Sequence, residues 1–434
     1  MDRWSFSTLV LDPHDMVTLP MLTDELSPTN KDVNDALSVG ILGSGPTGAL
    51  LALGLSRLGC RVQIHDPLSA DQISSRSRAY AITHSSRRLL ERLDLWTSLQ
   101  PYLVPFRQLC LQDQWSKPSV WFRIADLAPA NRNADAIGWI LDHQPLMQEL
   151  LKRLDREANV ALQLGDRASS GVGQARDAGF DLIVAADGPK SSHRQAWRLP
   201  LWSFPYRQGC LTLKVSLRGA APATAHEYFR AEGPFAVLPL GGQAFQLVWS
   251  APLNRCRERA ALDPSTLLDL LATVLPSGLE PEALLDQPVA VPLQWSLAPK
   301  LARGRKILLG EAGHRCHPVG GQGLNLCWRD VDELIALVAA HQHAGLALHQ
   351  VSARYSCRRL VDLFLIGAGT DVLLRLFSNS WRGLRPVRFV ILLLIQRLPL
   401  LRRIALQVMT DGPMTILKAP PEWKQRGFRH GVQQ

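Results

Sequence analysis

The sequence predicts an α/β fold in which a parallel-sheet, nucleotide-binding domain is interrupted by an antiparallel sheet and followed by helices. Three observations predict it. A βαβ pattern with a glycine-rich turn lies near the start, short strand-like runs separated by Gly and Pro occupy the middle, and residues from Val331 onward have helical spacing. The 434 residues are enough for two or three packed layers.

Composition narrows the class of protein. Hydrophobic residues make up 46% and charged residues 20%, as in a globular protein. No apolar run approaches the roughly 20 residues of a membrane span. The net charge is +10, but no nucleic-acid motif accompanies it, so we expect no nucleic-acid partner. The seven cysteines form no Cys-x-x-Cys pair, which favours a reducing, cytoplasmic location over a disulfide framework.

The domain order follows from these patterns. The acidic residues 1–36 resemble neither a secretory signal nor a transit peptide, and we expect a dispensable, mobile extension or an upstream start that is not used. The nucleotide-binding domain is expected in three parts and the second domain in two, before a C-terminal helical region. The expected nucleotide-binding parts are 37–110, 140–200 and 301–370, the second-domain parts are 111–139 and 201–300, and the helical region is 371–434.

The first motif is the turn Gly43-Ser44-Gly45-Pro46-Thr47-Gly48. An apolar strand at 36–42 precedes it, a helix at 46–58 follows, and a second strand at 61–64 leads to Asp66. Such glycines let a pyrophosphate approach backbone N–H groups at a helix N-terminus, and the acid is placed for a ribose. A tight turn without a ligand is the alternative, and the combination favours a dinucleotide.

Two later segments each place polar residues after a strand. The run from Asp181 ends in Asp187-Gly188, which by itself is an ordinary turn. The run from Ile307 leads through Glu311 to a glycine-rich loop and a helix start, and such a loop suits a flat ring system while the acid suits a hydroxyl chain. The cluster from His314 to His317 invites a zinc interpretation, but no second ligand pair lies at a plausible spacing, so we expect no metal.

A fourth segment contains Arg76 and Arg78, just after the first βαβ unit. Guanidinium groups at this place are able to reach phosphates. When the segment is considered alone, a solvated, basic helix start is the preferred explanation of the same residues.

Together these segments resemble the class A flavin monooxygenases, and most of all the ubiquinone-biosynthesis hydroxylase family, which includes the 2-octaprenyl-6-methoxyphenol hydroxylases. The resemblance runs from about Val39 to about Met409 and includes the pattern from Glu227 to Leu240. It implies a glutathione-reductase-type FAD-binding domain with an inserted antiparallel-sheet substrate domain. It also implies NAD(P)H as reductant, O₂ as cosubstrate and a phenolic, prenylated quinone precursor hydroxylated through a flavin C4a-hydroperoxide.

The resemblance assigns residues to FAD. It places the turn from Gly43 to Gly48 at the pyrophosphate with Arg78 nearby, Asp66 at the ribose, Asp187-Gly188 at FAD and NAD(P)H, and Glu311 at the ribityl chain. Glu311 departs from the aspartate that is usual in the family: glutamate keeps the charge and the acceptors but adds a methylene. The loop expected at the isoalloxazine comprises Pro318, Gly320, Gly321, Gln322, Gly323, Leu324 and Asn325. The Pro318 carbonyl is the one candidate for orienting a phenol, and no side chain is assigned as acid or base.

Two alternatives stay open. A related flavoenzyme acting on a lipid, such as a reductase or an epoxidase, has the same fold. A flavin-binding scaffold of a quinone-biosynthesis complex, without turnover of its own, is the other, and the Glu311 departure keeps it open.

The C-terminal region predicts a membrane contact. Between Arg375 and Met409 there are seven arginines and no acidic residue, interleaved with apolar residues. This pattern is typical of helices lying on an anionic membrane surface, at the inner face of a membrane, and also of a solvated helical pair. Pro386 and Pro399 should divide the segment into at least two helices.

Overall fold

The computed structural model describes residues 36–115, 118–165, 179–221, 223–276 and 278–417. Residues 1–36 and 37–434 form two separate units, and all that follows concerns the second unit. The expectation about the acidic N-terminal segment therefore lies almost entirely outside the described residues. No helix in these ranges is both long and apolar enough to cross a bilayer.

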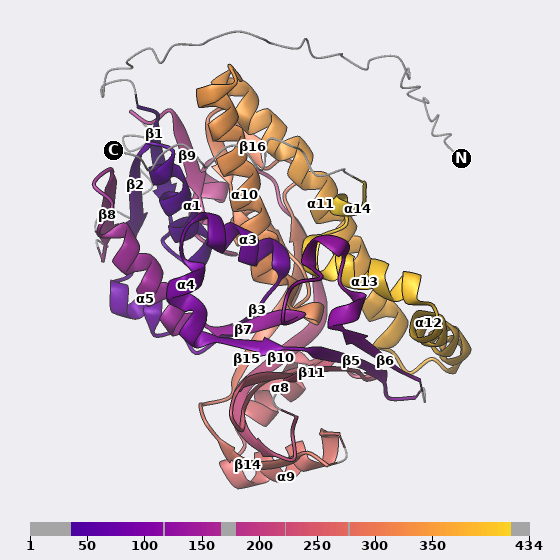
Figure 1. Ribbon diagram of the computed structural model, residues 1–434. Coiled ribbons are helices and arrows are strands. Elements are labelled where there is room, and N and C mark those ends of the chain that lie inside the picture. The colour runs from indigo at the N-terminus through magenta and orange to yellow at the C-terminus, as the bar shows by residue number, and fades with distance from the viewer. Residues whose placement is uncertain (1–35, 116–117, 166–178, 222, 277, 418–434) are drawn as a thin grey trace, which may run out of the picture. The chain divides into compact units, whose positions relative to one another are not determined.

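The first sheet has the strand order β16-β17-β9-β1-β2-β8 (Figure 1). Its neighbouring strands pair in parallel except at the β16–β17 edge. The helices α1 (Pro46–Arg57), α5 (His143–Leu154) and α10 (Gln322–His343) pack together beside it. The strands are β1 (Ser38–Leu42), β2 (Arg61–Asp66), β8 (Val160–Leu164), β9 (Leu182–Ala185), β16 (Ala302–Arg303) and β17 (Lys306–Leu308).

Burial explains why these strands have few polar residues. In β1, β9 and β17 the central side chains are fully or almost fully buried, as expected for a parallel sheet covered on its faces. Helix α1 buries nine consecutive residues from Gly48 to Ser56. The largest apolar core of the chain lies here and continues into α10 and α11 (Leu348–Phe377).

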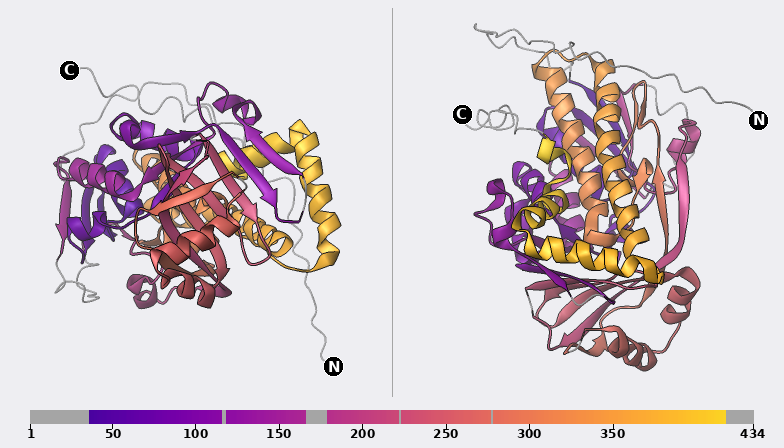
Figure 2. Two further views of the ribbon diagram at one scale, coloured as in Figure 1. Left: turned by 90° about the horizontal axis from the view of Figure 1, so that it is seen from below. Right: turned by 90° about the vertical axis from the view of Figure 1, so that its right-hand side faces the viewer.

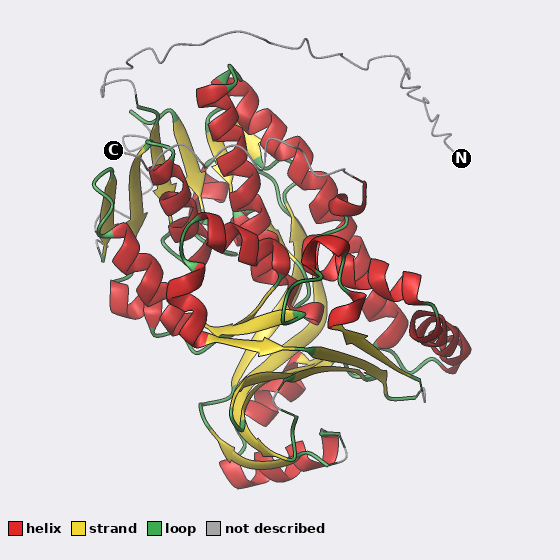
Figure 3. Cartoon of the chain, viewed as in Figure 1, coloured by secondary structure: helices red, strands yellow, loops and turns green. Residues whose placement is uncertain are grey.

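The second sheet is mostly antiparallel, in the order β18-β15-β10-β13-β12-β11-β5-β6, with β14 paired to β10. Figure 3 shows its long strands (yellow) reaching below the first sheet. The exception to antiparallel pairing is β5, which joins β11 in parallel. The strands are β5 (Gln108–Asp113), β6 (Ser119–Arg123), β10 (Trp202–Arg218), β11 (Thr224–Phe229), β12 (Phe235–Gly241), β13 (Ala244–Pro252), β14 (Glu280–Leu284), β15 (Val289–Leu297) and β18 (His314–Arg315).

The two faces of this sheet have different neighbours. One face, with Leu213, Phe235 and Trp249, forms a core with residues of α8 (Leu253–Ala260) and α9 (Pro264–Val274). The opposite face, with Leu109 and Phe229, forms a core with Val319 and with residues of the C-terminal helices. The segment just before α10 therefore lies against the second face.

A small sheet, β3-β7-β4, supports the loops that follow the first βαβ unit. Short helices flank it. The elements are β3 (Ala79–Ile82), β4 (Leu103–Phe106), β7 (Gly138–Asp142), α2 (Ala70–Ser74), α3 (His84–Arg92) and α4 (Trp96–Leu99).

Helices end the described chain: α11 is followed by α12 (Arg385–Arg397), α13 (Pro399–Asp411) and α14 (Met414–Leu417). The right-hand view of Figure 2 shows the C-terminal helices (yellow) crossing the long pair α10 and α11 (orange). Pro386 lies in the first turn of α12 and Pro399 in that of α13, so the segment divides into helices as its prolines predict.

The mixed α/β fold with parallel and antiparallel sheets and C-terminal helices confirms the predicted fold class. The β1–α1–β2 unit lies within two residues of its expected ranges, and short strands fill the middle of the chain as predicted. The β5–β6 hairpin and the parallel β5–β11 pairing were not predicted, because that pairing joins segments more than 100 residues apart.

Candidate FAD site

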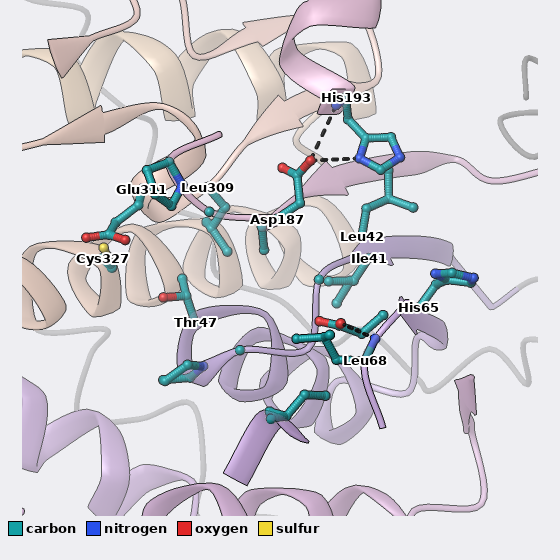
Figure 4. A pocket seen from close by; sticks show the side chains of 18 of the residues that line it. Ile41, Leu42, Thr47, His65, Leu68, Asp187, His193, Leu309, Glu311 and Cys327 are labelled. Carbon is teal, nitrogen blue, oxygen red and sulfur yellow. Dashed lines mark hydrogen bonds and ion pairs between the residues drawn. The ribbon is translucent and has the colours of Figure 1, made fainter. Parts of the chain in front are cut away.

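A cavity of about 910 Å³ opens where β1, β2 and β9 end. Residues directly after each of these strands line it, together with parts of β3, α1 and α10 (Figure 4). In parallel sheets the carboxyl ends of neighbouring strands are the usual place for a ligand. Of the predicted site residues, the cavity is lined by Gly43, Gly45, Pro46, Thr47, Asp66, Arg78, Asp187, Gly188, Glu311, Gly323 and Leu324.

The glycines of the first turn have two different roles. Gly43 has φ +107°, and a Cβ there would lie 2.5 Å from the carbonyl oxygen of Ala186. A Cβ at Gly48 would lie 1.9 Å from the carbonyl oxygen of Gly43, so the fold itself requires both glycines. Gly45 has φ −63° and a Cβ there would meet nothing within 4 Å. A ligand, and not packing, therefore explains glycine at position 45.

The N-terminus of α1 has no side-chain cap, and the cavity borders its first turn at Pro46 and Thr47. The N-terminus of α10 has no side-chain cap either, and its first-turn residue Gly323 has open space where a Cβ would lie. Unpaired N–H groups and the helix dipole attract anions and partial negative charge. Both helices therefore offer donors to a ligand in this cavity.

Asp66 lies at the end of β2 and is 9% exposed. One carboxylate oxygen accepts a hydrogen bond from the backbone N–H of Ser44 (2.8 Å), and the other accepts one from that of Leu68 (3.0 Å). Each oxygen keeps a further lone pair for a sugar hydroxyl. Ser44 itself does not line the cavity, and its hydroxyl is buried without a partner among the described residues.

Arg76 and Arg78 both line the cavity, beside Tyr80 and His143. The guanidinium of Arg78 lies 5.2 Å from the centre of the Tyr80 ring. The Tyr80 hydroxyl is 2.8 Å from Nδ1 of His143. Sequence reasoning missed Tyr80 and His143, since their only local signal is an ordinary strand and an ordinary helix start.

Asp187 follows β9 and carries an unused acceptor. Its Oδ2 accepts hydrogen bonds from Nδ1 (2.9 Å) and the backbone N–H (3.3 Å) of His193. Burial would raise the pKa of Asp187, but these bonds and others hold it below its usual value. Its Oδ1 is buried without a partner among the described residues. An ionised oxygen without a donor at the cavity wall fits a ligand hydroxyl.

Glu311 lies in a short 3₁₀ segment after β17 and lines the cavity. In Figure 4 its side chain points toward Cys327 on α10. Burial, followed by the Glu311 charge, raises the pKa of the Cys327 thiol well above its usual value, so the thiol is neutral. Glu311 also lies close enough to Arg78 to favour the charged guanidinium.

Packing and hydrogen bonds on the side away from the cavity position the segment from Pro318 to Asn325. Gly320 and Gly321 have φ values of 70° and 63°, and a Cβ on Gly321 would lie 2.8 Å from Ala81. Gly323 and Leu324 line the cavity, whereas Pro318, Gly320, Gly321, Gln322 and Asn325 do not. Gln322 donates to the carbonyl oxygens of Gly320 (3.1 Å) and Met409 (3.0 Å).

Asn325 is completely buried and ties this loop to the β3–α3 junction. Its Oδ1 accepts from the Thr83 backbone N–H and the Ser86 hydroxyl, and its Nδ2 donates to the carbonyl oxygens of Ala81 and Gly321. These bonds position the loop. A direct contact of Asn325 with the cofactor stays a prediction.

Glu227 on β11 is a buried acid at the opposite side of the loop, 8% exposed. Burial raises the pKa of Glu227 to about 7, while a hydrogen bond from the Gly320 backbone N–H acts in the other direction. The sequence showed Glu227 as part of a pattern, but did not indicate that it lies against the glycine loop.

The cavity fits FAD. It offers a glycine turn with open space at Gly45, helix N-termini for a pyrophosphate, acceptors at Asp66, Asp187 and Glu311 for sugar and ribityl hydroxyls, and the cation of Arg78. These are the groups that a long dinucleotide with a central pyrophosphate needs.

Comparison with known proteins also indicates FAD. A family described as FAD binding domain matches residues 149–361. The chain is 29% identical to the 3-demethoxyubiquinol 3-hydroxylase of Escherichia coli, over 86% of this chain and 98% of the relative. It is 28% identical to the ubiquinone hydroxylase UbiL of Rhodospirillum rubrum, over 91% of this chain and 93% of the relative.

Solved structures share the fold. The p-nitrophenol 4-monooxygenase PnpA of Pseudomonas putida aligns with a TM-score of 0.70 and 18% identity, covering 86% of this chain and 96% of that one. The Klebsiella pneumoniae HpxO structure with FAD and uric acid aligns with a TM-score of 0.65 and 18% identity, covering 88% and 97%.

The fold and the cavity define a class A FAD-dependent monooxygenase, an enzyme whose cofactor is FAD. Such enzymes take electrons from NAD(P)H and use O₂. Within this class, the chain is similar to ubiquinone hydroxylases over most of its length.

Proposed function

We propose that this enzyme hydroxylates the ring of a phenolic, prenylated quinone precursor with NAD(P)H and O₂. The observation that carries the proposal is the position of the 318–325 segment. Gly323 and Leu324 line the FAD cavity, while Val319 packs into the core on the second face of the antiparallel sheet. A ring bound between loop and sheet is therefore next to the cofactor.

When bound, FAD supplies the redox chemistry, taking a hydride from the nicotinamide and activating O₂ for transfer to an electron-rich ring. The chain supplies the surroundings. Phe229, Val319 and Phe377 form an apolar core beside the loop and keep water away from it. With FAD bound, the N–H dipoles at the N-terminus of α10 would stabilise negative charge on the reduced flavin.

The experiment is an NAD(P)H-oxidation and oxygen-uptake assay on purified protein, which should be yellow with non-covalent FAD. We expect a candidate prenylphenol to gain one oxygen atom, labelled when ¹⁸O₂ is used. A reduced product without added oxygen would identify a related flavoenzyme instead. If NAD(P)H does not reduce the bound flavin in the presence of any candidate phenol, the result would favour a flavin-binding scaffold without turnover.

The relatives' names support a quinone precursor, since they are ubiquinone hydroxylases. A profile of quinone precursors in cells lacking the protein would identify the substrate. The accumulated intermediate should lack one ring hydroxyl group.

We also propose that α12 and α13 contact an anionic membrane surface. Val387, Phe389, Val390 and Leu394 on α12 are exposed, as are Leu400, Leu401 and Ile404 on α13. Exposed arginines accompany them at positions 382, 397 and 403. An apolar helix face bordered by cations favours an interfacial position, where each basic group adds about 1 kcal/mol.

Four of the seven arginines have partners within the protein. Arg375 pairs with Asp371, and the guanidinium of Arg385 lies over the Trp115 ring. The other two are Arg388 and Arg402. Arg388 is fully buried and donates to the carbonyl oxygens of Leu376 and Asn379. Arg402 donates to the Asp126 carboxylate at 2.8 Å. The interpretation of all seven as surface cations was therefore wrong for Arg388, because its guanidinium joins α12 to the end of α11.

Co-sedimentation with vesicles that contain anionic lipid tests the membrane contact. Exchanging Arg382, Arg397 and Arg403 for Glu should abolish binding at low salt. Exchanging Arg156, Arg257 and Arg303, which are exposed elsewhere, changes the net charge equally and should have a smaller effect. Equal effects of the two sets, or no binding by the wild type, would contradict the proposal.

A further inference from the structure

Two polar atoms close to the 318–325 loop have no hydrogen-bond partner among the described residues. They are Nε2 of His317, a residue only 1% exposed, and the hydroxyl of Tyr206 on β10. Their rings meet edge to face with centroids 5.4 Å apart. Buried polar groups are nearly always paired with protein or with an ordered molecule, so two unpaired groups side by side indicate an oxygen that both bind.

The hydrogen-bond state of His317 follows from its other ring nitrogen. The backbone N–H of Val319 donates to Nδ1 at 3.2 Å, so the neutral ring carries its proton on Nε2. Burial lowers the pKa of His317 to about 3, and the ring is therefore neutral at neutral pH. His317 offers an N–H donor without a charge.

The position of Tyr206 follows from an irregularity in β10. The pairing of β10 with β15 shifts register between Pro205 and Gly209, and such bulges redirect side chains, often beside active sites. Burial raises the pKa of the Tyr206 phenol, so its hydroxyl keeps its proton and both donates and accepts.

The charged side chains that act on Tyr206 have opposite signs. Asp371 and Arg375 act on Tyr206 in opposite directions and form an ion pair with each other at 2.6 Å. Burial raises the pKa of the neighbouring Cys316 thiol to about 11, which keeps it neutral. Two neutral donors match a neutral oxygen better than a carboxylate or a phosphate.

A second tyrosine–histidine pair in the same sheet provides a contrast. On β11 the Tyr228 hydroxyl and Nδ1 of His226 lie 2.9 Å apart, with their rings stacked at 5.6 Å. The two polar atoms of that pair form a hydrogen bond with each other. The same two residue types therefore bond directly in one place and leave their polar atoms unpaired in the other.

We propose that Nε2–H of His317 and the hydroxyl of Tyr206 form a subsite for one neutral oxygen on the substrate ring: a hydroxyl, methoxy or carbonyl oxygen. The inference rests on the proposed function for the presence of a ring. His317 directly precedes Pro318, in the segment that continues to the cavity-lining residues Gly323 and Leu324. An oxygen held there fixes which ring carbon faces the cofactor.

The test is a binding titration of FAD-loaded protein without NAD(P)H, followed by the flavin absorbance. The probes are 2-allylphenol and allylbenzene, which differ by one hydroxyl group. Tyr206→Phe should raise the Kd for 2-allylphenol about three- to tenfold and leave the Kd for allylbenzene unchanged, because a neutral hydrogen bond contributes that much. His317→Asn, which keeps an acceptor for Val319, should have the same selective effect.

Tyr228→Phe is the matched control and should change neither Kd. If Tyr206→Phe weakens both probes equally, or neither, the pair holds only a water molecule or acts through packing, and the subsite is wrong. Failure of the wild type to prefer 2-allylphenol over allylbenzene would also overturn it. The titration measures binding and not turnover, so the two ideas fail separately. Variants without a selective effect on 2-allylphenol refute the subsite, whereas absent product in the oxygenation assay refutes the function.

Discussion

The carboxylate of Asp66 accepts a hydrogen bond of 2.8 Å from the backbone N–H of Ser44. Because the same carboxylate also accepts from Leu68, one side chain joins the end of β2 to the glycine turn before α1. The residue expected to bind a ribose thus also fixes the turn expected at the pyrophosphate.

Asp66→Asn should therefore reduce both stability and FAD affinity. The amide keeps one acceptor, so one of the two N–H donors loses its partner at about 1–3 kcal/mol. Urea unfolding of the apoprotein and FAD titration measure the two effects. The exposed Asp71→Asn is the control; an Asp66 variant that matches it in both measurements would contradict the double role.

Gly45→Val should abolish FAD binding and leave the apoprotein stable. The backbone at position 45 is in an ordinary extended conformation and a Cβ would enter open cavity space, so the branched side chain obstructs the ligand alone. Gly48→Ala is the contrasting variant and should destabilise the fold itself, since its Cβ would overlap the Gly43 carbonyl oxygen. Thermal unfolding of both apoproteins, with flavin content, distinguishes the two outcomes.

Glu311→Asp should be tolerated, and Glu311→Ala should lose about 1–3 kcal/mol of FAD binding free energy. The carboxylate lines the cavity, and we expect it to accept hydrogen bonds from the ribityl hydroxyls. Isothermal titration of apoprotein with FAD gives the affinities. Equal affinity in the wild type and Glu311→Ala would show that Glu311 is not a flavin ligand.

Glu227→Gln should remove a pH dependence of stability. The folded-state pKa of Glu227 is raised from 4.5 to about 7, so the group is protonated in both states below pH 4.5. Between these values the unfolded chain releases the proton and the folded chain keeps it. The free energy of unfolding therefore falls by about 1.4 kcal/mol per pH unit, and the total loss reaches about 3 kcal/mol above pH 7.

The measurement is the free energy of unfolding of wild type and Glu227→Gln between pH 4.5 and 8. The glutamine variant should gain on the wild type as the pH rises, while the exposed Glu258→Gln should show no such trend. A constant difference across this range would mean that Glu227 does not titrate as its burial implies.

The sequence by itself determined the local parts of this protein. The turn from Gly43 to Gly48, the strand before it, the helix after it and Asp66 follow from sterics and hydrogen bonds that act over a few residues, and the structure has them within two residues of their expected places. Glu311 follows a strand as its local sequence predicts, and helices begin at Pro386 and Pro399 for the same short-range reasons.

Only the tertiary structure decided how side chains far apart in sequence meet. In the first turn of α10 it directs Leu324 to the cavity and the neighbouring Asn325 to Thr83, 242 positions away. It buries Arg388 against α11, raises the pKa of Glu227 and brings Tyr206 to His317. These outcomes depend on which surfaces pack together and exclude water, and no short-range pattern in the chain encodes that.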